Sequence, residues 1–122
     1  MTTYKIVLIV ALLFPVKVGF AGEADVIDVK ATKTGANVYY FSVTVQHNDE
    51  GWNHYANKWD VVAPDGKVLG TRILHHPHVN EQPFTRSLSG VTISDTIETV
   101  IIRAHDSVHL YGGDTVMLEL PK

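Results

Sequence analysis

Seven segments of the chain alternate apolar and polar residues with a period of two, which is typical of half-buried β-strands. The clearest is residues 38–46, VYYFSVTVQ, where Tyr39, Phe41, Val43 and Val45 fall on one face. Its aromatic and β-branched side chains suit a pleated surface. The other predicted strands are residues 24–33, 58–63, 67–74, 84–93, 98–104 and 114–120.

Turn signals separate these strands, and two irregularities interrupt them. Residues 34–37, Pro64-Asp65-Gly66 and residues 94–96 are rich in turn-forming residues. The alternation changes phase between Val26 and Ile27, which predicts a β-bulge. Gly90 predicts a kink in the fifth strand.

The number and spacing of the strands predict an all-β fold, a seven-stranded antiparallel immunoglobulin-like β-sandwich. Trp59, on the third strand, matches the position of the core tryptophan in such domains, so we expect it to be buried. Over residues 22–122 the pattern resembles immunoglobulin and fibronectin-III domains, although the paired cysteines of true immunoglobulin domains are absent. The segments EQPFTRSLSGV and RAHDSVHLYGG also resemble those of small exported bacterial proteins of uncharacterised function, which implies no activity.

Residues 1–21 have the layout of a secretory signal peptide. Lys5 precedes an almost wholly apolar run, residues 6–16, and Gly19-Phe20-Ala21 places small residues at the −3 and −1 positions of a cleavage site. The alternative, a membrane anchor, is disfavoured because a span needs about 20 apolar residues. We therefore predict cleavage after Ala21, with residues 22–122 exported to the periplasm or secreted, without a stable membrane anchor.

Composition excludes several classes of function. Residues 22–122 hold eight basic and thirteen acidic residues, a net charge of −5 with histidines neutral. Nucleic-acid binders normally present a basic face, so no nucleic-acid partner is expected. The chain has no cysteine, which excludes disulfides, thiolate metal sites and cysteine nucleophiles within it.

All seven histidines fall in loops that the predicted fold places at one end of the sandwich. Antiparallel strands that follow one another in sequence place alternate loops at the same end of a sandwich. The loops after the second, fourth and sixth predicted strands contain every histidine, and the other turns contain none. Loops on a rigid scaffold often carry binding groups. These histidines are His47, His54, His75, His76, His78, His105 and His109.

We predict a metal or polar-ligand site at this end. His76-Pro77-His78 has i,i+2 spacing, which in extended backbone points both rings to one face. Neutral imidazole is a common metal ligand, and the absence of soft ligands favours zinc or copper(II). The predicted centre is His76, His78 and His109, with His47, His54, His105 and Glu81 as additional ligands. Three acids are candidates to complete the site or orient its imidazoles, namely Asp49, Glu50 and Asp106.

Two other interpretations remain open. The histidines could hydrogen-bond the nearby acids and loop backbones, holding the loops in place or sensing pH. Alternatively, Trp52, Tyr55 and Tyr111, which fall in the same loops, could bind an exported protein or a glycan.

Catalysis is disfavoured. Asp106, Ser107 and His109 supply the residue types of a hydrolytic triad, but the chain lacks a Gly-x-Ser-x-Gly elbow. The sequence therefore favours a binding or accessory module over an enzyme.

Overall fold

The computed structural model describes residues 22–122, so the predicted signal peptide lies outside the described residues. Within them, no helix is long and apolar enough to cross a membrane. The strands are β1 (Asp25–Gly35), β2 (Val38–Gln46), β3 (Ala56–Val62), β4 (Val68–Ile73), β5 (Phe84–Thr92), β6 (Thr99–Asp106) and β7 (Val116–Glu119).

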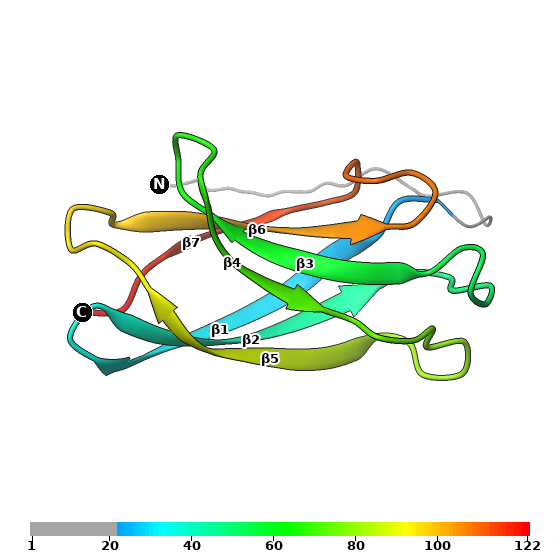
Figure 1. Cartoon of the computed structure of the whole chain (residues 1–122), viewed down its shortest axis with the longest axis horizontal. Coiled ribbons are helices and arrows are strands. Elements are labelled where there is room, and N and C mark those ends of the chain that lie inside the picture. Colours follow the sequence, from blue (N-terminus) through cyan, green and yellow to red (C-terminus); the bar gives the residue numbers. More distant parts are fainter. Residues whose placement is uncertain (1–21) are drawn as a thin grey trace, which may run out of the picture.

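The strands form two antiparallel sheets that face each other across one hydrophobic core (Figure 1). One sheet has the order β1-β2-β5, and the other has the order β4-β3-β6-β7. The predicted all-β sandwich is confirmed. Consecutive strands β1 and β2 pair within one sheet, whereas β2 and β3 belong to different sheets, so the β2–β3 loop crosses between them.

The core is built from the inward positions of the alternating strands. Phe41, Val43 and Val45 of β2 are fully buried, as the period of two predicts. Trp59 of β3 is also fully buried, which confirms its predicted place between the sheets. It lies in the middle of the four-stranded sheet, opposite Arg72 of β4 and Ala104 of β6.

Both predicted irregularities are present. The pairing of β1 with β2 shifts register between Val26 and Asp28, at the point where the alternation changes phase. In the pairing of β2 with β5, Tyr39 lies opposite Val91 and Phe41 opposite Leu88, so β5 has an extra residue. Gly90 lies in this bulge with a φ of 69°, a conformation that glycine adopts at little cost.

The β2–β3, β4–β5 and β6–β7 loops meet at one end of the sandwich, which we call the histidine pole (Figure 1). Two contacts confirm this prediction. The backbone N–H of His78 donates to the Asp49 carboxylate, and the His54 ring contacts the Asp106 carboxylate. The three loops therefore form one continuous surface above the core.

Two strands extend further toward this pole than the sequence predicts. β3 begins at Ala56 rather than at residue 58, and β6 continues to Asp106 rather than ending at Ala104. Asp106 keeps the inward phase of Val100, Ile102 and Ala104, and all four are buried. As a result, His105 is a strand residue and not a loop residue.

Candidate metal centre

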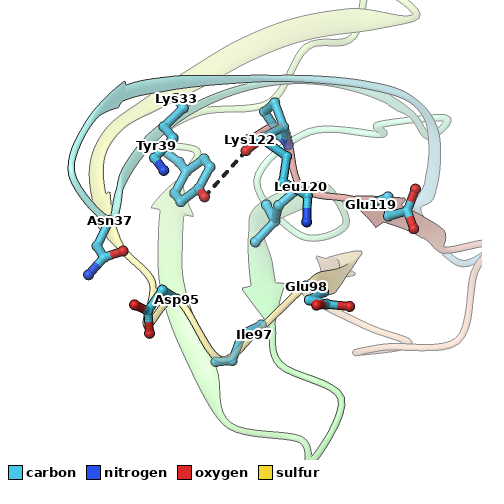
Figure 2. Close-up of a pocket in the computed structure, with 10 residues that line it drawn as sticks. Lys33, Asn37, Tyr39, Asp95, Ile97, Glu98, Glu119, Leu120 and Lys122 are labelled. Atoms are coloured by element: carbon cyan, nitrogen blue, oxygen red, sulfur yellow. Dashed lines mark hydrogen bonds between the residues drawn. The ribbon is translucent and has the colours of Figure 1, made fainter.

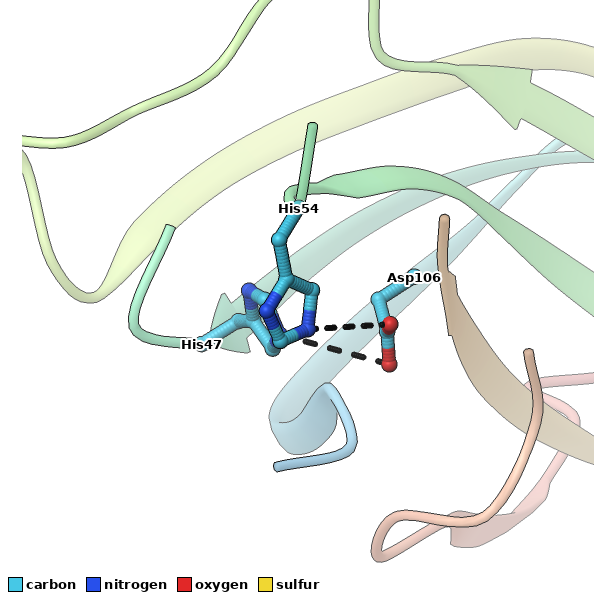
Figure 3. A group of neighbouring side chains, drawn as sticks. All are labelled: His47, His54 and Asp106. Atoms are coloured by element: carbon cyan, nitrogen blue, oxygen red, sulfur yellow. Dashed lines mark ion pairs between the residues drawn. The ribbon is translucent and has the colours of Figure 1, made fainter. Parts of the chain in front are cut away.

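Three buried side chains converge at the histidine pole (Figure 3). His47 directly follows β2, His54 lies in the β2–β3 loop, and Asp106 ends β6. One potential ligand atom from each lies within 4.8 Å of the other two. Because β2 and β6 belong to different sheets, this group spans the top of the core between the two layers.

Both ring nitrogens of His47 face hydrogen-bond acceptors. Nδ1 lies 2.6 Å from Oδ1 of Asp49, and Nε2 lies 2.9 Å from the carbonyl oxygen of Gly22. Burial alone would lower the pKa of His47, but the bond to Asp49 and the charges of Asp49 and Asp106 raise it above its usual value. A metal at Nε2 would replace the proton there, while Nδ1–H remained bound to Asp49.

His54 resembles His47 on the Nδ1 side of its ring. Its Nδ1 lies 2.7 Å from Oε1 of Glu50, so that carboxylate orients the ring from the Nδ1 side. Its Nε2 lies 3.2 Å from Oδ1 of Asp106. Each imidazole therefore has a carboxylate on Nδ1, which is the usual arrangement for histidines that bind metals through Nε2.

Asp106 is a fully buried carboxylate. Its Oδ1 accepts the backbone N–H groups of Val108, at 2.9 Å, and His109, at 2.7 Å. Burial alone would raise the pKa of Asp106, but these bonds and the positive charge of His47 lower it. The carboxylate therefore stays ionised and available as an oxygen ligand.

Two atoms of this group lack hydrogen-bond partners among the described residues. They are Nε2 of His54 and Oδ2 of Asp106, and both are buried. Buried polar atoms are nearly always paired, so each such atom calls for an explanation. Oδ2 of Asp106 also lies 4.0 Å from Nε2 of His47. A cation held by bonds of about 2.0–2.2 Å would satisfy these atoms, and the three potential ligand atoms lie within 4.8 Å of one another.

Asp49 holds the surrounding loops together. Its Oδ1 accepts from the His47 ring and from the backbone N–H of Ala56, at 2.9 Å. Its Oδ2 accepts the backbone N–H of His78, at 2.7 Å. Burial alone would raise the pKa of Asp49, but these three bonds lower it. One ionised side chain thus connects the β2–β3 loop, the start of β3 and the β4–β5 loop.

His109 joins the buried group at its edge. Its Nδ1 lies 3.3 Å from Oδ1 of Asp106, and its side chain is 35% exposed. Its ring centroid lies 4.9 Å from that of His54. Of the three residues predicted as the centre of the site, His109 is therefore the one that contacts the buried group.

The His76-Pro77-His78 segment lies in a different environment. Nε2 of His78 accepts from the Arg86 guanidinium at 2.9 Å, and its ring stacks on Phe84 with centroids 4.0 Å apart. Burial and the Arg86 charge lower the pKa of His78. His76 is exposed and lies beside His78, while Glu81 pairs with Arg86 at 3.2 Å. The role of these residues as ligands stays a prediction.

His105 points away from the buried group, because its β6 neighbours Ala104 and Asp106 face the core. Its Nδ1 lies 2.6 Å from Oδ1 of Asn57, and its ring meets the edge of Tyr111. Burial and the charge of Lys58 lower its pKa. His105 thus belongs to the outer face of the four-stranded sheet.

Asp60 is a buried carboxylate on this outer face, and no local sequence pattern marks it as a functional residue. Its Oδ1 accepts from Thr71 at 2.6 Å, and its Oδ2 accepts from Tyr111 at 2.6 Å and from Arg103 at 3.1 Å. The Arg103 guanidinium also lies over the Tyr111 ring, 4.0 Å from its centroid. Thr71 and Arg103 are the cross-strand partners of Asp60, so knowing the strand register would have revealed the cluster.

The Asp60 cluster makes stability depend on acid pH. Burial alone would raise the pKa of Asp60, but its bonds to Thr71, Tyr111 and Arg103 lower it. A lowered folded-state pKa gives stability that is present above about pH 3.9 and is lost as pH falls through the folded value. We expect Asp60→Asn to destabilise the protein at pH 7 and to differ less from the wild type at pH 3, measured by urea unfolding. An Asp60→Asn deficit that stayed constant between these pH values would contradict this expectation.

A cavity of about 370 Å³ lies at the opposite end of the sandwich (Figure 2). Tyr39 crosses it, and its hydroxyl donates to the Pro121 carbonyl at 3.4 Å. Its lining combines charged residues of both signs, including Lys33, Glu98 and Glu119, with the apolar residues Ile97 and Leu120. No residue of the buried histidine group lines it.

Comparison with known proteins shows sequence similarity to a longer protein. The chain is similar to a protein of Halomicrobium mukohataei named "Putative lipoprotein", with 38% identity over 97 residues. These residues are 80% of this chain and 47% of that protein, so the chain spans about half the length of its relative. No protein-family model matches the chain, and no solved structure matches it. The immunoglobulin-like assignment therefore stays a prediction.

Proposed function

We propose that the protein is an exported binding module whose histidine pole holds one divalent cation, zinc or copper(II). The proposed ligands are Nε2 of His47, Nε2 of His54 and the Asp106 carboxylate. The observation that carries the proposal is the pair of buried atoms without a hydrogen bond, Nε2 of His54 and Oδ2 of Asp106, which lie beside a third potential ligand atom.

The donor set favours this class of cation. Two imidazoles and one carboxylate suit zinc or copper(II), whereas calcium and magnesium prefer oxygen ligands alone. Asp49 and Glu50 hold the two imidazoles from the Nδ1 side, which raises their basicity and fixes their orientation. His109, at the exposed edge, is available as a further ligand or as a neighbour of an external one.

Two observations support export. Residues 1–21 have the pattern of a secretory signal peptide. The name of the relative describes a lipoprotein, a class of protein held at a membrane by an attached lipid. This chain contains no cysteine, so a thioether-linked lipid would have no attachment point within these 122 residues.

A second candidate function is the binding of an exported protein or a glycan. Trp52 is 67% exposed and packs edge-on against Tyr55, with ring centroids 5.6 Å apart. Such a pair on a loop is a typical anchor for a partner. Tyr111 fits this role less well, because its hydroxyl is committed to Asp60. Partner binding through Trp52 is compatible with a metal below it.

The test of the metal site is calorimetric titration of untagged protein with zinc and with copper(II). We expect one saturable site in the wild type and at least about tenfold weaker binding in His54→Asn. His76→Ala is the matched control, because it removes an exposed imidazole at the same pole and should leave the affinity unchanged. Affinity should also fall as pH drops, because ligand imidazoles must lose a proton, and the fall should begin above pH 6.5 because the pKa of His47 is raised above that ordinary value.

Two results would contradict the proposal. The first is the absence of saturable binding in the wild type. The second is retention of binding by His54→Asn together with its loss in a His76→Ala/His78→Ala double variant, which would move the site to the His76-Pro77-His78 segment. Melting temperatures with and without metal provide an independent measurement, because a metal that binds only the folded state raises the melting temperature.

A further inference from the structure

Gly22, the first residue after the predicted cleavage point, lies against His47, one of the three proposed metal ligands. Its carbonyl oxygen is 2.9 Å from Nε2 of His47, the same nitrogen that faces Asp106. Two ligands that occupy adjacent positions on one metal, with bonds of about 2.0–2.1 Å, are separated by about 3 Å. The carbonyl of Gly22 is therefore already at the spacing of a neighbouring ligand.

The β6–β7 loop holds this end of the chain in place. The backbone N–H of Val26 donates to the carbonyl of Asp114 at 2.9 Å, and the backbone N–H of Asp114 donates to the Asp25 side chain at 2.7 Å. A Cβ added to Gly113 would clash with the Ala24 carbonyl oxygen. The Gly112-Gly113 pair thus permits the close approach that fixes residues 23–25, and with them Gly22.

Cleavage after Ala21 would change the chemistry of Gly22. In the uncleaved chain its nitrogen is an amide, whose lone pair is delocalised into the preceding carbonyl and is a poor ligand. After cleavage the nitrogen is a primary amine with an available lone pair. The amine and the carbonyl oxygen of one residue can close a five-membered ring with a metal.

We propose, on the basis of the metal site proposed above, that the α-amino group of Gly22 is a further ligand of that metal, so that removal of the signal peptide completes the site. An added amine nitrogen makes the ligand set richer in nitrogen and suits copper(II), which favours tetragonal nitrogen and oxygen ligands and binds more tightly than zinc to most such sites. The preferred cation of the processed protein is therefore copper(II).

The experiment compares forms that differ only at the N-terminus. One form begins at Gly22, and a second carries a single alanine before Gly22, so its amine is displaced by one residue. Both contain every strand of the sandwich. Asp95→Ala in the first form is the control variant, because it changes an exposed acid at the opposite end of the sandwich and retains the α-amine of Gly22. Each form is titrated with copper(II) sulfate, and the visible absorption band of the bound copper(II) is recorded.

We expect the alanine-extended form to bind copper(II) at least about tenfold more weakly than the form that begins at Gly22. Its copper(II) band should lie at longer wavelength, because it has one nitrogen ligand fewer. Equal affinity and equal spectra in the two forms would overturn the inference and leave the proposed metal site standing. If neither form binds copper(II) saturably, the proposed function fails, and this inference fails with it.

Cleavage after Ala21 is tested separately, by the mass of the exported protein. The full chain is exported by a bacterial host, and the mass of the purified protein gives its first residue. A mass that corresponds to Gly22–Lys122 supports the inference. A first residue other than Gly22 overturns it, whatever the metal affinity.

Discussion

Trp59→Ala is expected to lower the free energy of unfolding by about 3–5 kcal/mol, as truncation of a large aromatic side chain in a core does. Trp59 is fully buried and has strands on both sides within the four-stranded sheet. The surrounding side chains come from two sheets that pairing holds in register, so they can only partly fill the space left by the indole. Urea unfolding followed by circular dichroism measures this loss.

Two variants make the Trp59 test specific. Trp59→Phe should retain much of the stability, because the indole N–H has no hydrogen-bond partner among the described residues and its removal leaves no acceptor unpaired. Trp52→Ala removes a tryptophan that is 67% exposed and should change stability by no more than about 0.5 kcal/mol. A loss below about 1 kcal/mol for Trp59→Ala would show that the core does not depend on this side chain.

The strands were predictable because one face of each sheet must be buried. The period of two in residues 38–46 predicts β2 with its observed bounds, and the phase change after Val26 predicts the bulge. The ends of β3 and β6 were less predictable, because polar residues at the pole can continue a strand as well as begin a loop. The inward phase of Val100, Ile102 and Ala104 was the available signal that Asp106 would also be buried.

The candidate site was predictable only in outline. Alternate loops of a sandwich must gather at one end, so the histidine pole followed from strand count and direction. The choice of ligands did not follow, because it depends on non-local contacts. Arg86 on β5 occupies Nε2 of His78, and the Gly22 carbonyl reaches Nε2 of His47 from the other end of the sequence. Neither contact leaves a local pattern in the chain.

The partners of Asp60 were also unpredictable, because they come from neighbouring strands and a loop. Beside Trp59 and Val61, Asp60 occupies the outward phase of β3, where a charge normally faces solvent. The register of the sheet places Arg103 and Thr71 directly beside it, and Tyr111 covers it from the β6–β7 loop. The alternation predicts which face of the sheet each side chain occupies. It does not predict the register between strands, so the residues that pair with an outward-facing charge cannot be identified from it.

Asp49→Ala should have an effect on stability as large as that of Trp59→Ala, through a different mechanism. The substitution leaves the buried His47 ring without its carboxylate and the backbone N–H groups of Ala56 and His78 without their acceptor. Removing one partner of a buried charged pair typically costs about 3–5 kcal/mol. The change should also weaken metal binding by about 10–100-fold, because His47 loses the group that orients it.

Asp49→Asn and Asp95→Ala separate the contributions to this effect. Asn retains one oxygen acceptor where three donors converge. The unfolding free energy of Asp49→Asn should therefore fall between those of the wild type and Asp49→Ala. Asp95 is an exposed acid in the turn between β5 and β6, at the opposite end of the sandwich, and its removal should cost less than about 0.5 kcal/mol. Equal losses in Asp49→Ala and Asp95→Ala would mean that the Asp49 contacts do not hold the two loops and the start of β3 together. A large loss of stability in Asp49→Ala with unchanged metal affinity would instead place the metal away from His47.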